Sequence, residues 1–467
     1  MSAAAGVAAR PPAFPEQRFS TLTAIIAWAM IVMMIVPGDL DYSFSADTSD
    51  GNPVTRTLWL LILAVSLVII FLRGPLALRL VRRINIYYLL FLALAFTSVI
   101  WSIDPEMTVR RLVRLLIMCS AFLAVAVGGW NPRRFQQLIR PLVTLLLAGS
   151  IVFGLARPDL AIHHETNAEL LNAWHGLAPT KNALGALASF GVILSLHAWL
   201  SRETGRLGAL FGAAVGGACL ILSRSQTSIM ATVLTAAALL LLMRTPGSMR
   251  RSVPYLATGL IILILVYSMA MLRVIPGLEV LLSPIPMITG KDLTFSGRAE
   301  IWAVVVDHIK LRPVLGSGYA AYWTMGIPTP DMESYSVIAP LHGFYPGSCH
   351  NGYLQVLNDL GAVGLVILLG YLMVYFRQSI RLYAIDRTQG ALFLALLLQQ
   401  ATINLSEPLW LNALLFEFVF MSLATTCMAR ALLETDAGGR PRSAQTRPRV
   451  ANRIVRAPAR RPFGARS

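Results

Sequence analysis

The stretch LWLLILAVSLVIIFL, residues 58–72, decides the class of fold because it contains no charged side chain. A membrane-spanning helix needs about 20 mostly apolar residues, and comparable stretches recur along almost the whole chain. Of the 467 residues, 56% are hydrophobic and 13% are charged, whereas a soluble domain carries roughly 25% charged residues. The sequence therefore predicts an all-α polytopic membrane protein.

From this stretch outward, the apolar segments predict about twelve membrane-spanning helices. They lie at approximately residues 20–36, 58–72, 84–100, 112–128, 139–156, 183–200, 207–223, 228–243, 255–275, 362–378, 390–407 and 409–428. The first segment is not followed by a small-residue cleavage site, so we expect a retained helix rather than a cleaved signal peptide.

The net charge of +16 comes mainly from arginines in short connections and in the C-terminal tail. Alternate connections carry these arginines, at residues 73–83, 133–140, 202–206, 244–251 and 377–387. Cytoplasmic loops of membrane proteins are enriched in Lys and Arg, so we expect both termini in the cytoplasm. In a bacterium this describes an inner-membrane protein whose opposite connections face the periplasm. Orientation in the membrane explains the charge, and we expect no nucleic-acid partner.

This orientation divides the chain into five parts. They are a cytoplasmic segment 1–19, helices 1–9 in 20–275, a periplasmic loop with short helices in 276–361, helices 10–12 in 362–428 and a basic tail 429–467. The tail is rich in Arg, Pro, Ala and Ser and should be disordered. Contact with anionic membrane lipids is the simplest role for the tail, and binding to a protein partner is the alternative.

The periplasmic loop contains the motif SGRAEIW, residues 296–302. Ser296 or Gly297 can cap a helix, which places Arg298 near a helix N-terminus. Backbone N–H groups and a guanidinium together favour an oxyanion or a phosphate. The alternative is an ordinary ion pair between Arg298 and a carboxylate such as Glu300 or Asp307.

A second motif in the same loop is HNGYLQVLNDLG, residues 350–361. Its apolar residues recur at helical spacing and predict an amphipathic helix that begins at His350 and leads into the next span. A neutral imidazole can accept a proton near neutral pH, although a lone histidine is more often structural. Asn351 is a further candidate for a substrate contact.

Two more cationic residues lie at predicted periplasmic ends of helices. Arg224 interrupts the apolar sequence in LSRSQTS, residues 222–228, and Lys181 follows the loop part of HGLAPTKNALG, residues 175–185. A cation at such a boundary is costly unless it is paired, functional or able to reach the interface.

The motif WSIDP, residues 101–105, is followed by three arginines on the predicted periplasmic side, Arg110, Arg111 and Arg114. They either reach the membrane interface or pair with Asp104 and Glu106, which is the favoured interpretation, or they form a second patch that faces phosphate. Both interpretations stay open.

The sequence gives little support for a metal, a disulfide or a thiol mechanism. The four cysteines have no CxxC pair and no metal-ligand spacing, so we expect no metal and no cofactor. Cys349 precedes His350, where a passive loop cysteine competes with a nucleophile. Glu417 lies in the last apolar segment, where a proton-relay role is the functional alternative.

These motifs together resemble the superfamily of O-antigen ligases and O-antigen polymerases. The matching pieces are WSIDP, HGLAPTKNALG, LSRSQTS, SGRAEIW with PVLGSGY, and HNGYLQVLNDLG with Gly364, in the family's order over roughly residues 95–370. The motif sequences KNALG and SRSQTS are most similar to those of exopolysaccharide polymerases of the ExoQ type.

The resemblance implies a membrane glycosyltransferase. Its donor would be a glycan on undecaprenyl diphosphate at the periplasmic face, and the glycan would pass to an acceptor hydroxyl with inversion and without a metal. Residue by residue, it implies that Arg298 and Arg224 hold the diphosphate with support from Lys181. It implies that His350 accepts the proton of the acceptor or positions its hydroxyl.

Three functions remain in competition. We favour a polymerase of exopolysaccharide or O-antigen repeat units, with chain-length regulators or export proteins as candidate partners. A ligase that transfers glycan to lipid A-core or to protein is the alternative. A transporter of lipid-linked oligosaccharide is less favoured because it would need polar residues inside the helix bundle, whereas the ionisable residues here gather at one edge.

Overall fold

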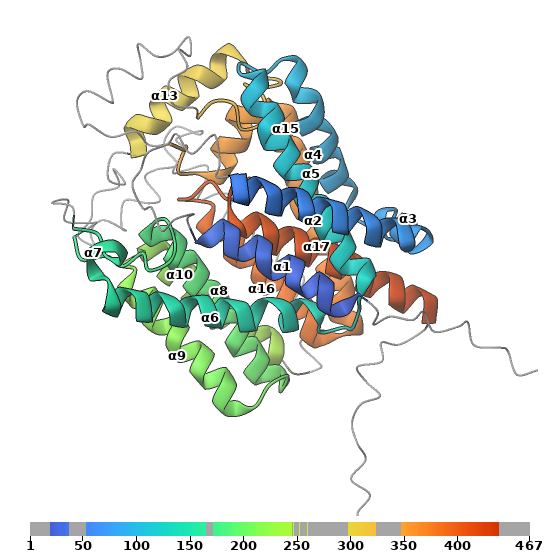
Figure 1. Cartoon of the computed structure of the whole chain (residues 1–467), viewed down its shortest axis with the longest axis vertical. Coiled ribbons are helices and arrows are strands. Elements are labelled where there is room, and N and C mark those ends of the chain that lie inside the picture. Colours follow the sequence, from blue (N-terminus) through green and yellow to red (C-terminus); the bar gives the residue numbers. More distant parts are fainter. Residues whose placement is uncertain are drawn as a thin grey trace, which may run out of the picture.

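The computed structural model describes residues 19–36, 53–164, 171–244, 298–323 and 347–438, with the single residues 246, 252 and 259. Within these residues the regular elements are helices, and one isolated backbone bridge joins Ile162 to Trp174. The helices pack side by side in one bundle (Figure 1). The predicted all-α class is therefore confirmed.

The helices in chain order are α1 (Ser20–Ile35), α2 (Pro53–Leu72), α3 (Gly74–Val81), α4 (Ile86–Thr97), η3 (Ser98–Ile100), α5 (Pro105–Gly128), α6 (Arg134–Ala156), α7 (Pro158–Ala161), α8 (Lys181–Ser201), α9 (Arg206–Leu222), α10 (Gln226–Arg244), α13 (Arg298–Leu311), α15 (Gly352–Ile385), α16 (Arg387–Ile403) and α17 (Phe416–Gly438). Seven of them, α2, α5, α6, α8, α10, α15 and α17, are long and apolar enough to cross a membrane. The broken pair of α3 with α4 and η3, bent by 97°, would be an eighth span. The chain is thus a multi-pass membrane protein.

The number of spans differs from the sequence-based count of twelve. Among the described residues, α1 and α9 are apolar but shorter than the spanning helices, and α16 has 17 residues. Apart from residue 259, the predicted span at 255–275 lies outside the described residues, as does most of the predicted loop 276–361. A count of twelve therefore stays a prediction.

The boundary between the last two predicted spans, 390–407 and 409–428, is corrected by the structure. Helix α16 ends at Ile403 and α17 begins at Phe416, and the residues between them form a non-helical connection, called here the 404–415 loop. Pro408 has no amide hydrogen and disfavours helix in the residue before it. The hydropathy pattern does not reveal this loop, because its residues Leu409, Trp410 and Leu411 are apolar and are buried like those of a spanning helix.

Helix α15 consists of two helices joined at a kink. Gly361, at the kink, has φ 65° and ψ −166°, a conformation that only glycine adopts readily. The backbone of the PVLGSGY segment pairs with this kink: Ser317 N–H donates to the Asn358 carbonyl at 3.0 Å and Gly318 N–H to the Asp359 carbonyl at 2.9 Å. The predicted short amphipathic helix before a span is the first part of α15.

The arginine-rich connections lie together at one end of the bundle. Arg83 and Arg381 both pair with Asp436, at 3.1 and 2.7 Å, and Arg387 donates to the Leu242 carbonyl at 2.8 and 2.6 Å. Helix α13 lies at one end of the molecule and the C-terminal end of α17 at the other (Figure 1). The two sets of connections predicted from arginine placement are therefore separated in space.

Candidate active site

The start of α15 is joined to the 404–415 loop by backbone and side-chain hydrogen bonds. Asn351 caps α15, because its Oδ1 accepts from Tyr353 N–H and Leu354 N–H, both at 3.0 Å. Its Nδ2 donates to the Leu405 carbonyl at 3.2 Å, and the next amide, Gly352 N–H, donates to the Asn404 carbonyl at 2.9 Å. Asn351 is thus a structural cap that fixes the position of His350.

Glycine at position 352 follows from this close approach. A Cβ there would collide with Oδ1 of Asn404. That same oxygen accepts from Leu409 N–H at 3.0 Å and Trp410 N–H at 2.7 Å, so it cannot move without opening the loop. The close packing of Gly352 against Asn404 therefore explains the glycine that follows Asn351.

Three sequence motifs meet at one carboxylate, Glu407 of the 404–415 loop. Arg298 Nη2 lies 3.2 Å from Oε1 of Glu407, and Asn182 Nδ2 of the KNALG motif donates to the same oxygen at 2.7 Å. His350 Nδ1 lies 3.7 Å from Oε2. These four residues are called the Glu407 cluster, and they come from α8, α13, the residue before the α15 cap and the 404–415 loop.

The cluster is partly buried, since Arg298, His350 and Glu407 expose 19%, 22% and 16% of their side chains. Burial alone would raise the pKa of the Glu407 carboxyl. His350, Arg298 and the amide of Asn182 outweigh it and hold that pKa below its ordinary value. An ionised carboxylate therefore faces a guanidinium and an imidazole.

The backbone at His350 is unusual. His350 has φ 48°, in the left-handed region that costs a non-glycine residue energy and is enriched at functional sites. Its Nδ1 is buried and has no hydrogen-bond partner within the part of the chain that the structure describes. Among the described residues, the carboxylate within 4 Å of this nitrogen is that of Glu407.

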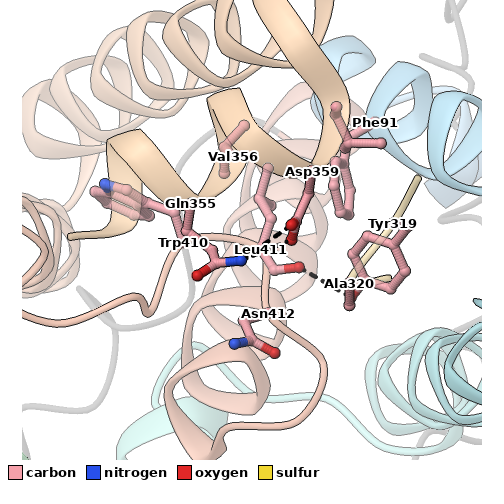
Figure 2. Close-up of a pocket in the computed structure, with 10 residues that line it drawn as sticks. Phe91, Tyr319, Ala320, Gln355, Val356, Asp359, Trp410, Leu411 and Asn412 are labelled. Carbon is pink, nitrogen blue, oxygen red and sulfur yellow. Dashed lines mark hydrogen bonds between the residues drawn. The ribbon is translucent and has the colours of Figure 1, made fainter. Parts of the chain in front are cut away.

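A small pocket lies behind the 404–415 loop (Figure 2). Its walls include Phe91, Tyr319, Gln355, Asp359 and Trp410. Gln355 donates to both oxygens of Asp359 at 3.0 and 3.1 Å, and the Tyr319 hydroxyl donates to the Leu411 carbonyl at 3.0 Å. The cavity has room for about one water molecule, so it supports the loop rather than holding a sugar.

The WSIDP motif supports the same region from the other side. Ile103 N–H donates to the Ser317 carbonyl at 2.9 Å, and the Trp101 indole donates to the Leu315 carbonyl at 3.0 Å. A Cβ on Gly318, which has φ 99°, would lie 2.5 Å from Ser102 Oγ. WSIDP, PVLGSGY and the α15 kink therefore form one packing unit.

The three arginines after WSIDP have separate partners. Arg110 pairs with Glu106 at 2.6 Å on an exposed helix face, as the ion-pair interpretation predicted. Arg111 donates to the Trp323 carbonyl at 3.2 Å, and the guanidinium of Arg114 lies 5.8 Å from the ring centre of Trp59. A role for these arginines in substrate binding stays a prediction.

Arg224 and Lys181 lie at neighbouring helix ends. Gly185 of KNALG packs against SRSQTS, because a Cβ there would lie 2.6 Å from Ser225 Cβ and 2.9 Å from Ser228 Oγ. Arg224 is exposed and donates to the Leu171 carbonyl at 2.9 Å. None of its contacts among the described residues reaches the Glu407 cluster, whereas Lys181 is adjacent in sequence to Asn182.

Other sequence candidates are resolved by burial. Cys349 is fully buried, its carbonyl accepts from the Trp302 indole at 2.9 Å, and burial raises the pKa of its thiol well above the ordinary value. A buried neutral thiol is a poor nucleophile, so Cys349 is a packing residue. Glu417 is buried in the first turn of α17, ten residues after Glu407 in the chain, and a proton-relay role for it stays a prediction.

Sequence reasoning missed Glu407 and Asn182. Glu407 is the last residue of the predicted span 390–407. The triplet Ser406-Glu407-Pro408 between two apolar segments nevertheless indicates a break in the helix. Asn182 was quoted in its motif and given no role. The sequence around Glu407 and Asn182 does not indicate which distant side chains these two residues contact.

Comparison with known proteins agrees with the resemblance of the motifs. Residues 209–369 match the family described as O-antigen ligase; this range includes Arg298 and His350. The chain is 26% identical over 320 residues to the exopolysaccharide production protein ExoQ of Rhizobium meliloti (strain 1021), across 65% of this chain and 67% of ExoQ. It is 32% identical over 85 residues to a Rickettsia felis (strain ATCC VR-1525 / URRWXCal2) protein named "Putative polysaccharide ligase", across 17% of this chain and 19% of that protein. The central part of the chain is therefore similar to O-antigen ligases, and about two thirds of the chain is similar to the exopolysaccharide production protein ExoQ.

Proposed function

We propose that this protein is a membrane glycosyltransferase that moves a glycan from undecaprenyl diphosphate to an acceptor hydroxyl at the periplasmic face. We propose further that the acceptor is another repeat unit, so that the protein polymerises exopolysaccharide or O-antigen. The observation that carries the proposal is the meeting of Arg298 and His350 at one partly buried carboxylate, Glu407. The similarity to a protein of exopolysaccharide production supports a role in making polysaccharide, and a ligase that transfers glycan to lipid A-core or to protein is the alternative.

The chemistry is a single displacement at the anomeric carbon. The acceptor oxygen forms a new bond to this carbon while the bond from carbon to the diphosphate oxygen breaks, which inverts the configuration. His350 takes the proton of the hydroxyl, and such general-base help is typically worth about 10²–10⁴-fold in rate. The Arg298 guanidinium stabilises the charge that develops on the leaving diphosphate.

The membrane orientation supports the same assignment. The Glu407 cluster lies at the end of the bundle opposite the contacts of Arg83, Arg381 and Arg387. Because positively charged connections face the cytoplasm, the cluster would face the periplasm. Lys181 and Arg224, at neighbouring helix ends, would extend the positive surface for the diphosphate.

Complementation of a null strain tests the catalytic residues. We expect His350→Ala and Arg298→Ala to insert normally in the membrane and to give no long-chain polysaccharide on a gel. Arg157→Ala is a charge-matched control, because Arg157 pairs with Asp159 on an exposed surface, and it should restore the product. Normal long chains from both site variants would refute the proposal.

The glycans of the null strain separate polymerase from ligase. Loss of a polymerase leaves single repeat units on lipid, whereas loss of a ligase leaves long chains that are not attached to their acceptor. Mass spectrometry of the lipid-linked fraction distinguishes these two outcomes, and long unattached chains would replace the polymerase assignment by the ligase.

A further inference from the structure

The Glu407 cluster contains a residue that the general mechanism does not use, the carboxylate itself. Glu407 lies outside the segment 209–369 that matches the O-antigen ligase family. It is nevertheless the group that Arg298, His350 and Asn182 share. A carboxylate placed behind both a proposed base and a proposed phosphate ligand can influence each of them.

The backbone around Glu407 holds the carboxylate in place. Glu407 N–H donates to the Ile403 carbonyl at 3.0 Å, and its own carbonyl accepts from Leu409 N–H at 3.1 Å. Pro408 restricts the conformation of the residue before it. On the side chain, the 2.7 Å hydrogen bond from Asn182 fixes Oε1, which leaves Oε2 directed to His350. The position of the carboxylate is thus set independently of a bound substrate.

The geometry at His350 assigns the two ring nitrogens. Nδ1 is the nitrogen that faces Oε2 of Glu407, so Nε2 lies on the opposite edge of the ring and is the nitrogen that can meet an acceptor hydroxyl. A hydrogen bond at one nitrogen of an imidazole selects the tautomer in which the other nitrogen accepts a proton. The 3.7 Å separation is longer than a hydrogen bond, and catalytic hydrogen bonds often shorten when substrate binds.

Arg298 offers a reason for such shortening. Its contact with Glu407 is a single one, from Nη2 to Oε1 at 3.2 Å, whereas a guanidinium binds phosphate best through two parallel N–H groups. A donor diphosphate therefore competes with Glu407 for Arg298. Once Arg298 turns to the diphosphate, the carboxylate keeps Asn182 and gains a stronger interaction with the ring of His350.

We propose that Glu407 is a positioning residue that orients His350 through Nδ1 and exchanges Arg298 with the donor diphosphate. The inference rests on the proposed function. During transfer, Nε2 takes the acceptor proton, Nδ1–H then faces the Glu407 carboxylate, and the positive charge on the ring is balanced. The new bond joins the acceptor oxygen to the anomeric carbon, the bond from that carbon to the diphosphate breaks, and His350 returns its proton to solvent.

The test compares turnover with diphosphate binding in the purified full-length protein in nanodiscs. Turnover is measured with the lipid-linked glycan that accumulates in the null strain, and binding with undecaprenyl diphosphate alone. We expect Glu407→Gln to lower kcat about 10²-fold, the lower range of general-base effects. Its affinity for undecaprenyl diphosphate should be equal to or higher than that of the unsubstituted protein, because Arg298 has lost a competing anion.

Two further variants keep the result interpretable. Glu407→Asp keeps the charge and should recover part of kcat. Asp159→Asn changes a carboxylate of an exposed pair with Arg157 and should leave both kcat and affinity unchanged.

Two outcomes would overturn the inference. Full activity of Glu407→Gln beside an inactive His350→Ala would remove Glu407 from the mechanism while the proposed function stands. Loss of undecaprenyl diphosphate binding together with kcat, with no recovery in Glu407→Asp, would make Glu407 a structural anchor only. Full activity of His350→Ala and Arg298→Ala would instead refute the proposed function itself.

Discussion

Two buried carboxylates at opposite ends of the bundle show how the neighbours of a residue decide its charge. Glu407 has Arg298 at 3.2 Å and an amide donor at 2.7 Å, and its pKa is lowered despite burial. Glu203, between α8 and α9, has Arg133 at 3.7 Å and an amide donor at 3.3 Å. Burial dominates there and raises the pKa of Glu203 to about 7, although Arg133 acts against it.

Glu203 should make stability depend on pH between about 4.5 and 7, its ordinary and its raised pKa. In this window the unfolded chain loses the proton and the folded protein keeps it, so stability falls as pH rises and then levels off. Glu203→Gln removes the titration. We expect its melting temperature in detergent, relative to the unsubstituted protein, to rise from pH 4.5 to pH 7 and to stay constant above it. A difference independent of pH would contradict the assignment.

At the scale of elements, the family motifs divide into two groups. WSIDP, PVLGSGY and the α15 kink pair through backbone hydrogen bonds and glycines, and they build the support. The motifs that contain Asn182, Arg298 and His350 contribute side chains to one carboxylate. The first group positions the second because α15 carries the kink and begins directly after His350 and its cap.

Gly361→Ala tests this support. The added Cβ would meet the Val314 carbonyl, and φ at this position is 65°, so strain of about 1–3 kcal/mol is expected. We expect a lower melting temperature and less polysaccharide. Gly217→Ala in α9, where a Cβ meets nothing within 4 Å, is the matched control and should be neutral or slightly stabilising. Equal melting temperatures for the two variants would show that the kink tolerates a side chain.

At the scale of the whole molecule, the bundle separates two chemical environments. One end holds the arginine contacts of Asp436, Glu203 and the Leu242 carbonyl. The other end holds α13, the start of α15 and the 404–415 loop, which surround the Glu407 cluster. A substrate carried by a membrane lipid can approach such an end without leaving the bilayer.

Labelling of introduced cysteines tests the orientation. The native Cys219, Cys349 and Cys427 are buried, so the probe positions are Lys310, 69% exposed on α13, and Arg381, 52% exposed near the C-terminal end of α15. We expect a membrane-impermeant maleimide to label Lys310→Cys in intact spheroplasts and Arg381→Cys only after permeabilisation. The reverse pattern would place the Glu407 cluster in the cytoplasm and would exclude the periplasmic mechanism.

The sequence by itself determined the all-α membrane class and the resemblance to O-antigen ligases and ExoQ. These features depend on local composition, periodicity and motif order, which can be read from the sequence without knowledge of long-range contacts. It also gave the amphipathic start of α15, since the apolar stripe of a helix is a local pattern.

Only the tertiary structure decided that Glu407 joins these motifs, that Asn351 is a cap and that Cys349 is a packing residue. Glu407 is 57 residues from His350 and 109 from Arg298, and such contacts depend on how helices pack, which no local pattern records. Hydropathy also placed a helix over the 404–415 loop, because it cannot distinguish apolar side chains buried by a loop from those on a spanning helix. The physical reason is the same in each case: burial and partner choice are properties of the packed bundle.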